Sequence, residues 1–311
     1  MYRFRKHIST ASPFFKEILT GISGTLSAAG DIILPRYCAV CGRRLLIHEK
    51  FICIYCLADF PYTYNWTIPH NRMADKFNEM IQRDIIDSNG SGMPMRGGIW
   101  TEPTENCTGK DGTGKDTTGK DQTESGTCKM KTVHEPYAYA AALFLYRGES
   151  AYRRIPHRLK YHGDISIGRH FGKMLAKRLA GTEHFSNVDM VIPVPLHWRR
   201  RWERGYNQAA VIAAETAAVL GTALREDILV RHRRTRTQTR LDVLGKIQNV
   251  RQAFGIREKF LASPPAARHI LLVDDVFTTG ATINACFRAL RTVYSTEVRI
   301  SAVTLAFVDS G

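Results

Sequence analysis

Apolar residues in the second half of the chain occur in short continuous runs, separated by stretches with helical spacing. The runs predict buried strands at 137–146, 188–195, 270–274 and 298–307, and a short strand at 228–230. Between these strands we expect a helical stretch that begins near residue 150 and is interrupted by Pro156. We also expect helices at 165–179, 207–220 and 281–293. Strands that alternate with helices predict an α/β domain over 135–311, with a mostly parallel sheet flanked by helices.

The segment 1–30 starts with several basic residues and then carries apolar residues at three- to four-residue spacing, which predicts an amphipathic helix. Pro13, Lys16 and Glu17 interrupt the apolar stretch, so it lacks the continuous apolar core of a signal peptide. No apolar run in the sequence approaches the ~18 residues of a membrane-spanning helix. We therefore expect a cytoplasmic chain with no transmembrane segment.

A stretch of different character, 84–134, is rich in Gly, Thr, Ser, Lys and Asp and has few large apolar residues. The tetrapeptide Thr-Gly-Lys-Asp begins at Thr108, Thr113 and Thr118 in a five-residue repeat. Such a segment buries too little apolar surface to offset the entropy lost on ordering. The pattern predicts a low-complexity, disordered linker.

The composition of the whole chain limits which class of protein it can be. Hydrophobic residues make up 44% of the 311 residues and aromatic residues 10%, which excludes wholesale disorder. The 44 Lys and Arg exceed the 29 Asp and Glu, which gives a net charge of +15. A balance this basic favours polyanions or phosphorylated ligands as partners.

Cysteines form two C-x2-C pairs near the N-terminus: Cys38, Cys41, Cys53 and Cys56. Each pair suits a tight turn that directs two thiolates to one point, and two such turns complete a tetrahedral zinc site. All four ligands would be thiolates, so the zinc would be structural. The alternatives are two disulfides, which a reducing compartment disfavours, or four unrelated thiols, which the paired spacing disfavours. We predict a zinc-ribbon module at 31–70.

The most informative stretch is a strand followed by a turn at 270–282. The strand delivers Asp274 and Asp275 to the carboxyl edge of the sheet, where ligands bind in α/β folds. A turn of two threonines and a glycine then opens into a helix, whose first backbone N–H groups suit a phosphate. Two adjacent carboxylates suit the vicinal hydroxyls of a ribose or a magnesium ion. This chemistry implies a phosphorylated ribose as ligand.

The sequence VDDVFTTGAT in this stretch resembles the motif with which type I phosphoribosyltransferases bind 5-phosphoribosyl 1-pyrophosphate (PRPP). The resemblance implies a type I phosphoribosyltransferase fold, with Asp274 and Asp275 on the ribose hydroxyls and Mg²⁺ bound together with PRPP. The 5-phosphate would lie on Thr278, Thr279, Gly280, Ala281 and Thr282. Purine-salvage members carry an Asp where this chain has Thr278, which disfavours a purine base as acceptor.

Four further segments resemble the ComF family: 191–197, 204–209, 231–238 and 249–254. Members of that family join an N-terminal four-cysteine zinc module to a phosphoribosyltransferase-like domain, and are associated with the uptake of single-stranded DNA during natural transformation. The resemblance covers about 32–62 and 137–307. Lys246 stands where the family pattern leads us to expect Arg.

The resemblance also assigns roles to two loops. The loop 159–164 corresponds to the pyrophosphate loop of the fold, and Lys160 would supply its positive charge. The stretch 199–207 corresponds to the mobile loop that covers the substrate, with Arg204 and Arg200 as candidates for the leaving pyrophosphate. Asp274, Asp275, Lys160 and Arg204 are thus the candidate catalytic residues. Gln208 and Gln238 could orient a nucleophile, and no general base stands out.

A non-catalytic role on the same fold is the alternative. Between 199 and 240 the chain has ten arginines and four acidic residues, with aromatic residues interleaved among the first of them. Arginines beside aromatic rings suit single-stranded nucleic acid, and the candidates are Arg199, Arg200, Arg201, Trp202 and Arg204. The simpler interpretation is that these arginines bind PRPP and the aromatic residues belong to the core. Single-stranded DNA and the DNA-uptake machinery are therefore candidate partners beside PRPP.

Overall fold

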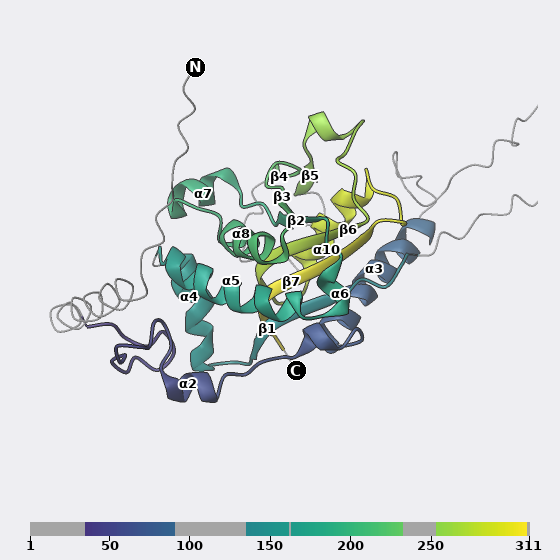
Figure 1. The fold of residues 1–311 in the computed structure, drawn as a ribbon. Helices are drawn as coiled ribbons and strands as arrows, with labels where there is room; N and C mark the ends of the chain where they lie inside the picture. The colour runs from purple at the N-terminus through teal and green to yellow at the C-terminus, as the bar shows by residue number, and fades with distance from the viewer. Residues whose placement is uncertain (1–34, 91–134, 162, 233–252, 310–311) are drawn as a thin grey trace, which may run out of the picture.

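The computed structural model describes residues 35–90, 135–161, 163–232 and 253–309 (Figure 1). Its centre is a five-stranded sheet with strand order β1-β7-β6-β2-β3, in which every neighbouring pair is parallel. The strands are β1 (Ala140–Tyr146), β2 (Met190–Pro193), β3 (Ala223–Leu224), β6 (His269–Phe277) and β7 (Arg299–Val308). A two-stranded antiparallel sheet pairs β4 (Leu229–Arg231) with β5 (Phe254–Ile256). The predicted α/β class is confirmed.

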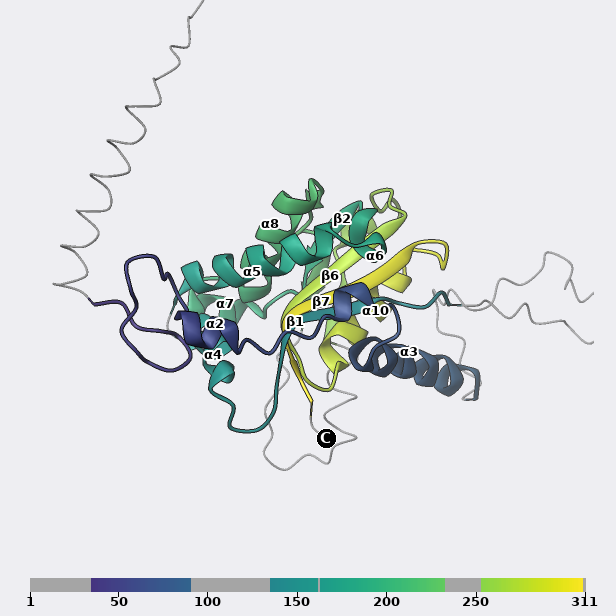
Figure 2. The ribbon, with the colours of Figure 1, turned by 60° about the horizontal axis from the view of Figure 1, so that its bottom comes forward.

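The long strands are apolar on both faces because helices cover both faces of the sheet. Figure 2 shows α5 (Ile165–Ala180) and α8 (Gln208–Leu220) on one face, and α3 (Arg72–Gly90) and α10 (Ala281–Arg291) on the other. Successive residues of a strand point to opposite faces. In β6, Ile270 therefore packs into the core beneath α3 and α10, and Leu271 into the core beneath α5 and α8.

Two predicted boundaries are wrong. Helix α3 extends to Gly90, so the first seven residues of the predicted linker, 84–90, are helical. Its buried residues Met73, Phe77 and Ile81 recur at helical spacing and attach the helix to the core. Pro156 does not interrupt a helix: it lies in the first turn of α4 (Arg154–Tyr161), where proline is tolerated because its missing N–H has no intrahelical partner. A 3-10 turn, η2 (Ala151–Arg153), precedes α4.

The four-cysteine segment packs directly onto the α/β domain and shares its core. Phe60 lies 5.2 Å from the ring of Phe144 and 5.8 Å from that of Phe171, measured between centroids. Tyr62 forms an antiparallel bridge with Phe144 of β1. Helix α2 (Ile54–Ala58) lies beside α4 in both views of the ribbon (Figures 1 and 2).

The shorter helices lie at the ends of the sheet: α6 (Glu183–Ser186) leads into β2, and α7 (Trp198–Arg204) follows it. Short 3-10 turns, η1 (Asn65–Thr67) and η3 (Glu258–Phe260), complete the described elements. The predicted helix within 1–30, the Thr-Gly-Lys-Asp repeat, Gln238 and Lys246 lie outside the described residues. Within the described ranges, no helix has the length and apolar character needed to cross a membrane.

Candidate ligand-binding site at the carboxyl edge of the sheet

A cavity of about 350 Å³ lies beyond the carboxyl ends of β2 and β6. It collects side chains from several parts of the fold: the end of β1, helix α4, the segment that follows β2, helix α7, the start of α8, strand β4, the end of β6 and the turn into α10. Its lining residues are Tyr146, Lys160, Tyr161, Val194, Pro195, Leu196, Arg200, Arg204, Asn207, Gln208, Ala209, Arg231, Asp274, Asp275, Val276, Thr278 and Thr282. Eight residues predicted from the sequence therefore meet in one cavity: Lys160, Arg200, Arg204, Gln208, Asp274, Asp275, Thr278 and Thr282.

The two aspartates lie within β6 itself, which extends beyond its predicted end. Asp275 is buried and its carboxylate lies 3.0 Å from the ammonium nitrogen of Lys160. Burial alone would lower the pKa of Lys160, but the charge and hydrogen bond of Asp275, together with the charge of Asp274, outweigh it and raise that pKa, so the lysine stays charged. Burial and the neighbouring charge of Asp275 raise the pKa of Asp274 to about 7. The Asp274 carboxyl group is therefore poised between its neutral and charged forms near neutral pH.

The turn after β6 adjoins this cavity and begins helix α10. Gly280 is the N-cap of the helix and has φ of +82°, a left-handed conformation that favours glycine. A Cβ atom at this position would lie 2.5 Å from Cζ of Phe277, so the turn is also tight. A small hollow of about 20 Å³ lies against the whole turn and is lined by Thr278, Thr279, Gly280, Ala281 and Thr282, together with Asp274, Val276, Phe277 and Ile283. The predicted phosphate-binding residues thus border one hollow beside the aspartates.

Helix α7 supplies two guanidinium groups to the cavity, from Arg200 and Arg204, which stand four residues apart on one side of the helix. Arg204 donates a hydrogen bond of 3.1 Å to the side-chain oxygen of Gln208. Gln208 is 3% exposed, and its side-chain nitrogen has no hydrogen-bond partner among the residues that the structure describes. A buried amide donor at the wall of a cavity favours a ligand that offers an acceptor.

Asn207, the last residue of the predicted mobile loop, also lines the cavity, and so does Arg231, for which no role in the site was predicted. Arg231 is the last residue of β4 and is packed over the ring of Phe254, with 5.0 Å between the guanidinium carbon and the ring centroid. Burial and the nearby charge of Arg200 lower the pKa of Arg231. Its place at the end of the short strand predicted at 228–230 is the signal that could have identified it.

The outer side of α7 carries Trp198 and Trp202, which are 70% and 82% exposed. They are four residues apart, so they share one side of the helix, and Arg200 and Arg204 share the other. Arg199 and Arg201 are exposed beside them and do not line the cavity. The interpretation of these two aromatic residues as core is therefore wrong, because both rings face solvent.

Tyr206 behaves differently from the tryptophans of α7. It is partly buried, and its hydroxyl donates a hydrogen bond to the backbone carbonyl of Leu159. This bond connects the segment after α7 to α4, next to Lys160. Asn207 caps α8 and donates a hydrogen bond of 3.0 Å to the carbonyl of Val194. Of the segment predicted as a mobile loop, 199–207, the first six residues belong to helix α7, and these contacts hold the part that follows it.

The four predicted cysteine ligands meet at one point. Their sulfur atoms all lie within 4.8 Å of one another, and the Sγ atoms of Cys41 and Cys53 are 3.7 Å apart. Zn–S bonds of about 2.3 Å in a tetrahedron place sulfur atoms roughly 3.8 Å apart, so the cluster is compatible with zinc. Gly42, directly after the first pair, has φ of +76°, as a tight turn requires.

The electrostatics of this cluster also suit a cation. Burial tends to raise the pKa of Cys38, but backbone N–H groups, including those of Val40 and Cys53 at 3.4 Å from its sulfur, lower it to about 7. Burial and the neighbouring thiols raise the pKa values of Cys53 and Cys56. Four thiolates cannot accumulate without a positive charge between them, and a bound metal would supply that charge.

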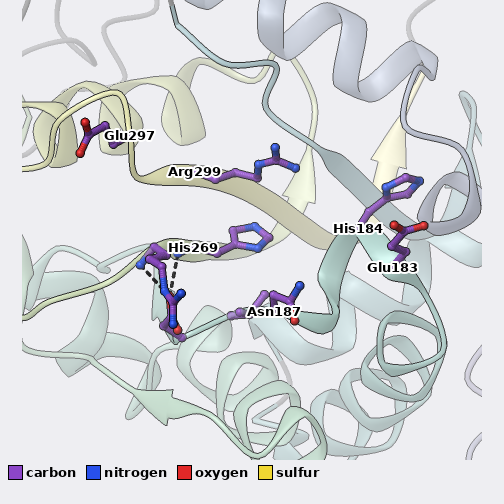
Figure 3. A pocket seen from close by; sticks show the side chains of 9 residues that line it. Glu183, His184, Asn187, His269, Glu297 and Arg299 are labelled. Carbon is purple, nitrogen blue, oxygen red and sulfur yellow. Dashed lines mark hydrogen bonds between the residues drawn. The ribbon is translucent and has the colours of Figure 1, made fainter.

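A second hollow, of about 650 Å³, lies at the opposite edge of the sheet, around the amino ends of β6 and β7 (Figure 3). Its lining mixes acidic side chains such as Glu183 and Glu297 with basic ones such as Arg268 and Arg299. Ligands of open α/β sheets bind at the carboxyl edge, and the mixture of charges selects no ligand class. The carboxyl-edge cavity is therefore the better candidate.

The fold and these features define an α/β protein with a polar cavity at the carboxyl edge of its sheet and a four-cysteine cluster that packs onto the same domain. Comparison with known proteins identifies similar chains. The competence protein F of Haemophilus influenzae is 32% identical over 149 residues, which are 46% of this chain and 63% of that protein. The DNA utilization protein YhgH of Salmonella typhi is 31% identical over 130 residues, which are 41% of this chain and 55% of that protein.

The protein of the same name from Escherichia coli strain K12 is 29% identical over 130 residues. This chain spans less than two thirds of the length of each of these relatives. A scan of protein-family models finds none that matches the chain. The resemblance to the ComF family predicted from the sequence motifs is confirmed by these relatives, over about half of the chain.

Proposed function

We propose that this protein binds PRPP at the carboxyl edge of its sheet and acts as a phosphoribosyltransferase-like protein in DNA utilisation. The observation that carries the proposal is the convergence of two carboxylates, four cationic side chains and a glycine-containing turn at one cavity. The turn at 278–282 suits the 5-phosphate, and Asp274 and Asp275 suit the ribose hydroxyls. Lys160, Arg200, Arg204 and Arg231 suit the pyrophosphate.

In the transfer reaction, the bond between C1 of the ribose and the pyrophosphate oxygen breaks, and the pyrophosphate leaves with the electron pair. The acceptor forms the new bond to C1 and loses its proton to solvent. The positive charges of Lys160, Arg200 and Arg204 would stabilise the departing anion, together with Mg²⁺ bound to it. Catalysis of this kind is mainly positioning and charge neutralisation, which suits a site without an obvious general base.

Relatives named for competence and for DNA utilisation support the second half of the proposal. The second candidate function is binding of single-stranded DNA, with the DNA-uptake machinery as partner and the cytoplasm as the place of action. Trp198 and Trp202 favour it, since two exposed rings beside Arg199 and Arg201 provide stacking surfaces next to positive charge. Core aromatic residues would not be exposed in this way.

The four-cysteine cluster belongs to the same proposal as a structural zinc site. Cys38, Cys41, Cys53 and Cys56 would hold the ion with no open coordination position, so it would stabilise the segment rather than take part in chemistry. Mass spectrometry of the native protein should find one zinc per chain. The Cys41→Ser variant should lose it, and a native protein without zinc contradicts this part.

The test of the PRPP site is calorimetric titration of PRPP with Mg²⁺ into the purified protein. We expect saturable binding by the native protein, and at least a hundredfold weaker binding by the double variant Asp274→Asn, Asp275→Asn. The matched control is Glu226→Gln, Asp227→Asn, which removes an adjacent acidic pair remote from the cavity lining and should keep native affinity. Folded native protein that does not bind PRPP would contradict the proposal.

The DNA candidate is tested separately with a fluorescent oligothymidylate. The double variant Trp198→Ala, Trp202→Ala should bind it at least tenfold more weakly, since each stacked base contributes about 1–3 kcal/mol. The control Leu261→Ala removes another exposed apolar side chain and should have native affinity. If the tryptophan variant binds the oligonucleotide as tightly as the native protein does, α7 is not part of the DNA-binding surface.

A further inference from the structure

A third cavity, of about 730 Å³, lies between helix α4 and the four-cysteine segment. It adjoins the carboxyl-edge cavity, because Tyr146, Lys160, Tyr161 and Val276 line both. The two cavities therefore adjoin, and we call them together the trough, which extends from the aspartates of β6 to the cysteine cluster. We call its outer part the α4 groove; it is lined by Cys38, Ala39, Tyr146, Arg153, Arg154, Pro156, His157, Arg158, Lys160, Tyr161 and Val276.

The charges of the α4 groove have one sign. Four of its lining side chains are cationic, namely Arg153, Arg154, Arg158 and Lys160, and none of its described lining residues carries a carboxylate. Three of these cations form ion pairs with residues outside this lining: Arg153 with Glu149, Arg158 with Asp164 and Lys160 with Asp275. Both arginines remain partly exposed, with 48% and 37% of the side chain accessible. The groove therefore suits an extended anion rather than a neutral ligand.

Flat side chains connect the two parts of the trough. The ring of His157 lies 4.7 Å from that of Tyr161, one helical turn later in α4, measured between centroids. The guanidinium of Arg204 lies over Tyr161, 5.3 Å from the ring centroid. Tyr161 is 64% exposed, so this row presents a ring surface at the junction of the two cavities. Planar groups beside cations suit nucleobases that follow a phosphate chain.

The far wall of the groove is fixed to α4 by hydrogen bonds. Arg154 donates to the backbone carbonyl of Val40, at 2.7 Å, between the cysteines of the first pair. Tyr152 donates from its hydroxyl to the carbonyls of Cys56 and Asp59, each at 2.9 Å. The wall formed by the four-cysteine segment is thus connected to the basic helix, and the groove is a built feature of the fold.

We infer that the α4 groove binds the backbone of single-stranded nucleic acid and leads it toward the carboxyl-edge cavity. The inference rests on the DNA-utilisation part of the proposed function and adds a surface distinct from the outer side of α7. A single strand is favoured over a duplex because only unpaired bases can stack on Tyr161. An acidic peptide would match the charges, but it would leave the row of rings without a function.

The experiment measures binding of a fluorescent fifteen-residue oligothymidylate by anisotropy, at several salt concentrations. The double variant Arg153→Gln, His157→Gln removes a charge and a ring that line the groove but not the carboxyl-edge cavity. We expect about tenfold weaker binding and a shallower dependence on salt. The matched control is Arg83→Gln on α3, which breaks an equivalent exposed ion pair with a residue four positions away and should bind as the native protein does.

The outcomes separate this inference from the proposed function. If the native protein binds the oligonucleotide and the groove variant binds it equally well, the groove is not part of the binding surface. If the native protein does not bind single-stranded DNA, the DNA-binding candidate and the groove both fail, whatever the PRPP titration gives. A duplex or polyglutamate that binds as tightly as the oligothymidylate would overturn the choice of ligand. PRPP affinity of the groove variant should be unchanged.

Discussion

The two ends of strand β6 carry partly or fully buried titratable side chains with opposite environments. At the amino end, His269 is buried and its Nε2 forms a hydrogen bond of 2.8 Å with Ser301 on β7. The carboxylate of Asp189 accepts hydrogen bonds from the backbone N–H groups of Arg268 and His269. Burial lowers the pKa of His269 to about 4, so the ring is neutral and its polar contacts lie within the protein.

At the carboxyl end, Asp274 has the reverse character. It stands next to another carboxylate, its pKa is raised to about 7, and it faces a cavity lined by Lys160, Arg200, Arg204 and Arg231. The polar groups at the amino end contact one another, whereas those at the carboxyl end surround a cavity in which we propose that an anionic ligand binds. A buried polar residue therefore indicates a binding site only where the protein itself does not supply all of its hydrogen-bonding or charged partners.

The largest effect is expected from Gly280→Ala at the turn after β6. A Cβ atom there would lie 2.5 Å from Phe277 and 3.0 Å from Met80, in a left-handed conformation. We expect about 3 kcal/mol of lost stability and a large loss of PRPP affinity, measured by chemical denaturation and calorimetry. Gly221→Ala is the control: its φ is +68°, but it faces open space, so only about 1 kcal/mol should be lost. Equal losses in both variants would mean that the turn is not tight.

The second-largest effect is expected from Asp274→Asn. Because the pKa of Asp274 is raised when the protein is folded, the folded protein keeps a proton that the unfolded chain releases between about pH 4 and 7. Stability of the native protein should therefore fall as pH rises through this window. Between pH 5 and 8 it should lose on the order of 2 kcal/mol more than the variant does, in urea denaturation.

The control for this measurement is Glu226→Gln, an exposed acidic residue, which should keep the native dependence on pH. The same Asp274→Asn protein should bind PRPP weakly, so that greater stability at pH 8 accompanies poorer binding. A variant with the native pH dependence would show that Asp274 is already ionised in the folded protein, with its charge matched by neighbouring groups and without a ligand.

His269→Gln should have the opposite pH dependence and an effect no larger than that of Asp274→Asn. The pKa of His269 is lowered when the protein is folded, so the unfolded chain takes up a proton below about pH 6.5 that the folded protein excludes. The native protein therefore loses stability as the pH falls from about 6.5 toward 4. The variant keeps a polar side chain but does not titrate, and it should lose about 2 kcal/mol less between pH 7 and 4.5. His48→Gln, at an exposed position, should change nothing.

The strands and the aspartate turn could be predicted because their signals are local. Continuous apolar runs are typical of strands covered on both faces, and the aspartates and threonines follow one another along β6 and its turn. The four-cysteine cluster could be predicted equally well, since the spacing of the cysteines alone indicates a shared metal. In each of these cases neighbouring residues in the sequence carry the whole pattern.

Features that depend on packing could not be predicted in this way. Helix α3 has a helical apolar pattern through Met73, Phe77 and Ile81, but its last turns merge into a polar, low-complexity stretch. The exposure of Trp198 and Trp202 depends on how α7 is oriented, and the composition of the helix does not determine that. Arg231 enters the cavity only because β4 pairs with β5 next to the main sheet.

The smallest expected effect tests the amino-end hollow in Figure 3. The double variant Glu183→Gln, Glu297→Gln removes two of its exposed carboxylates, which lie away from the carboxyl-edge cavity. If the two ends of β6 differ in function as their environments indicate, calorimetry should give a PRPP affinity within twofold of the native value, and stability should change by less than about 0.5 kcal/mol. A tenfold change in affinity would mean that the amino edge takes part in binding. The distinction between a stabilising end and a binding end of the strand would then fail.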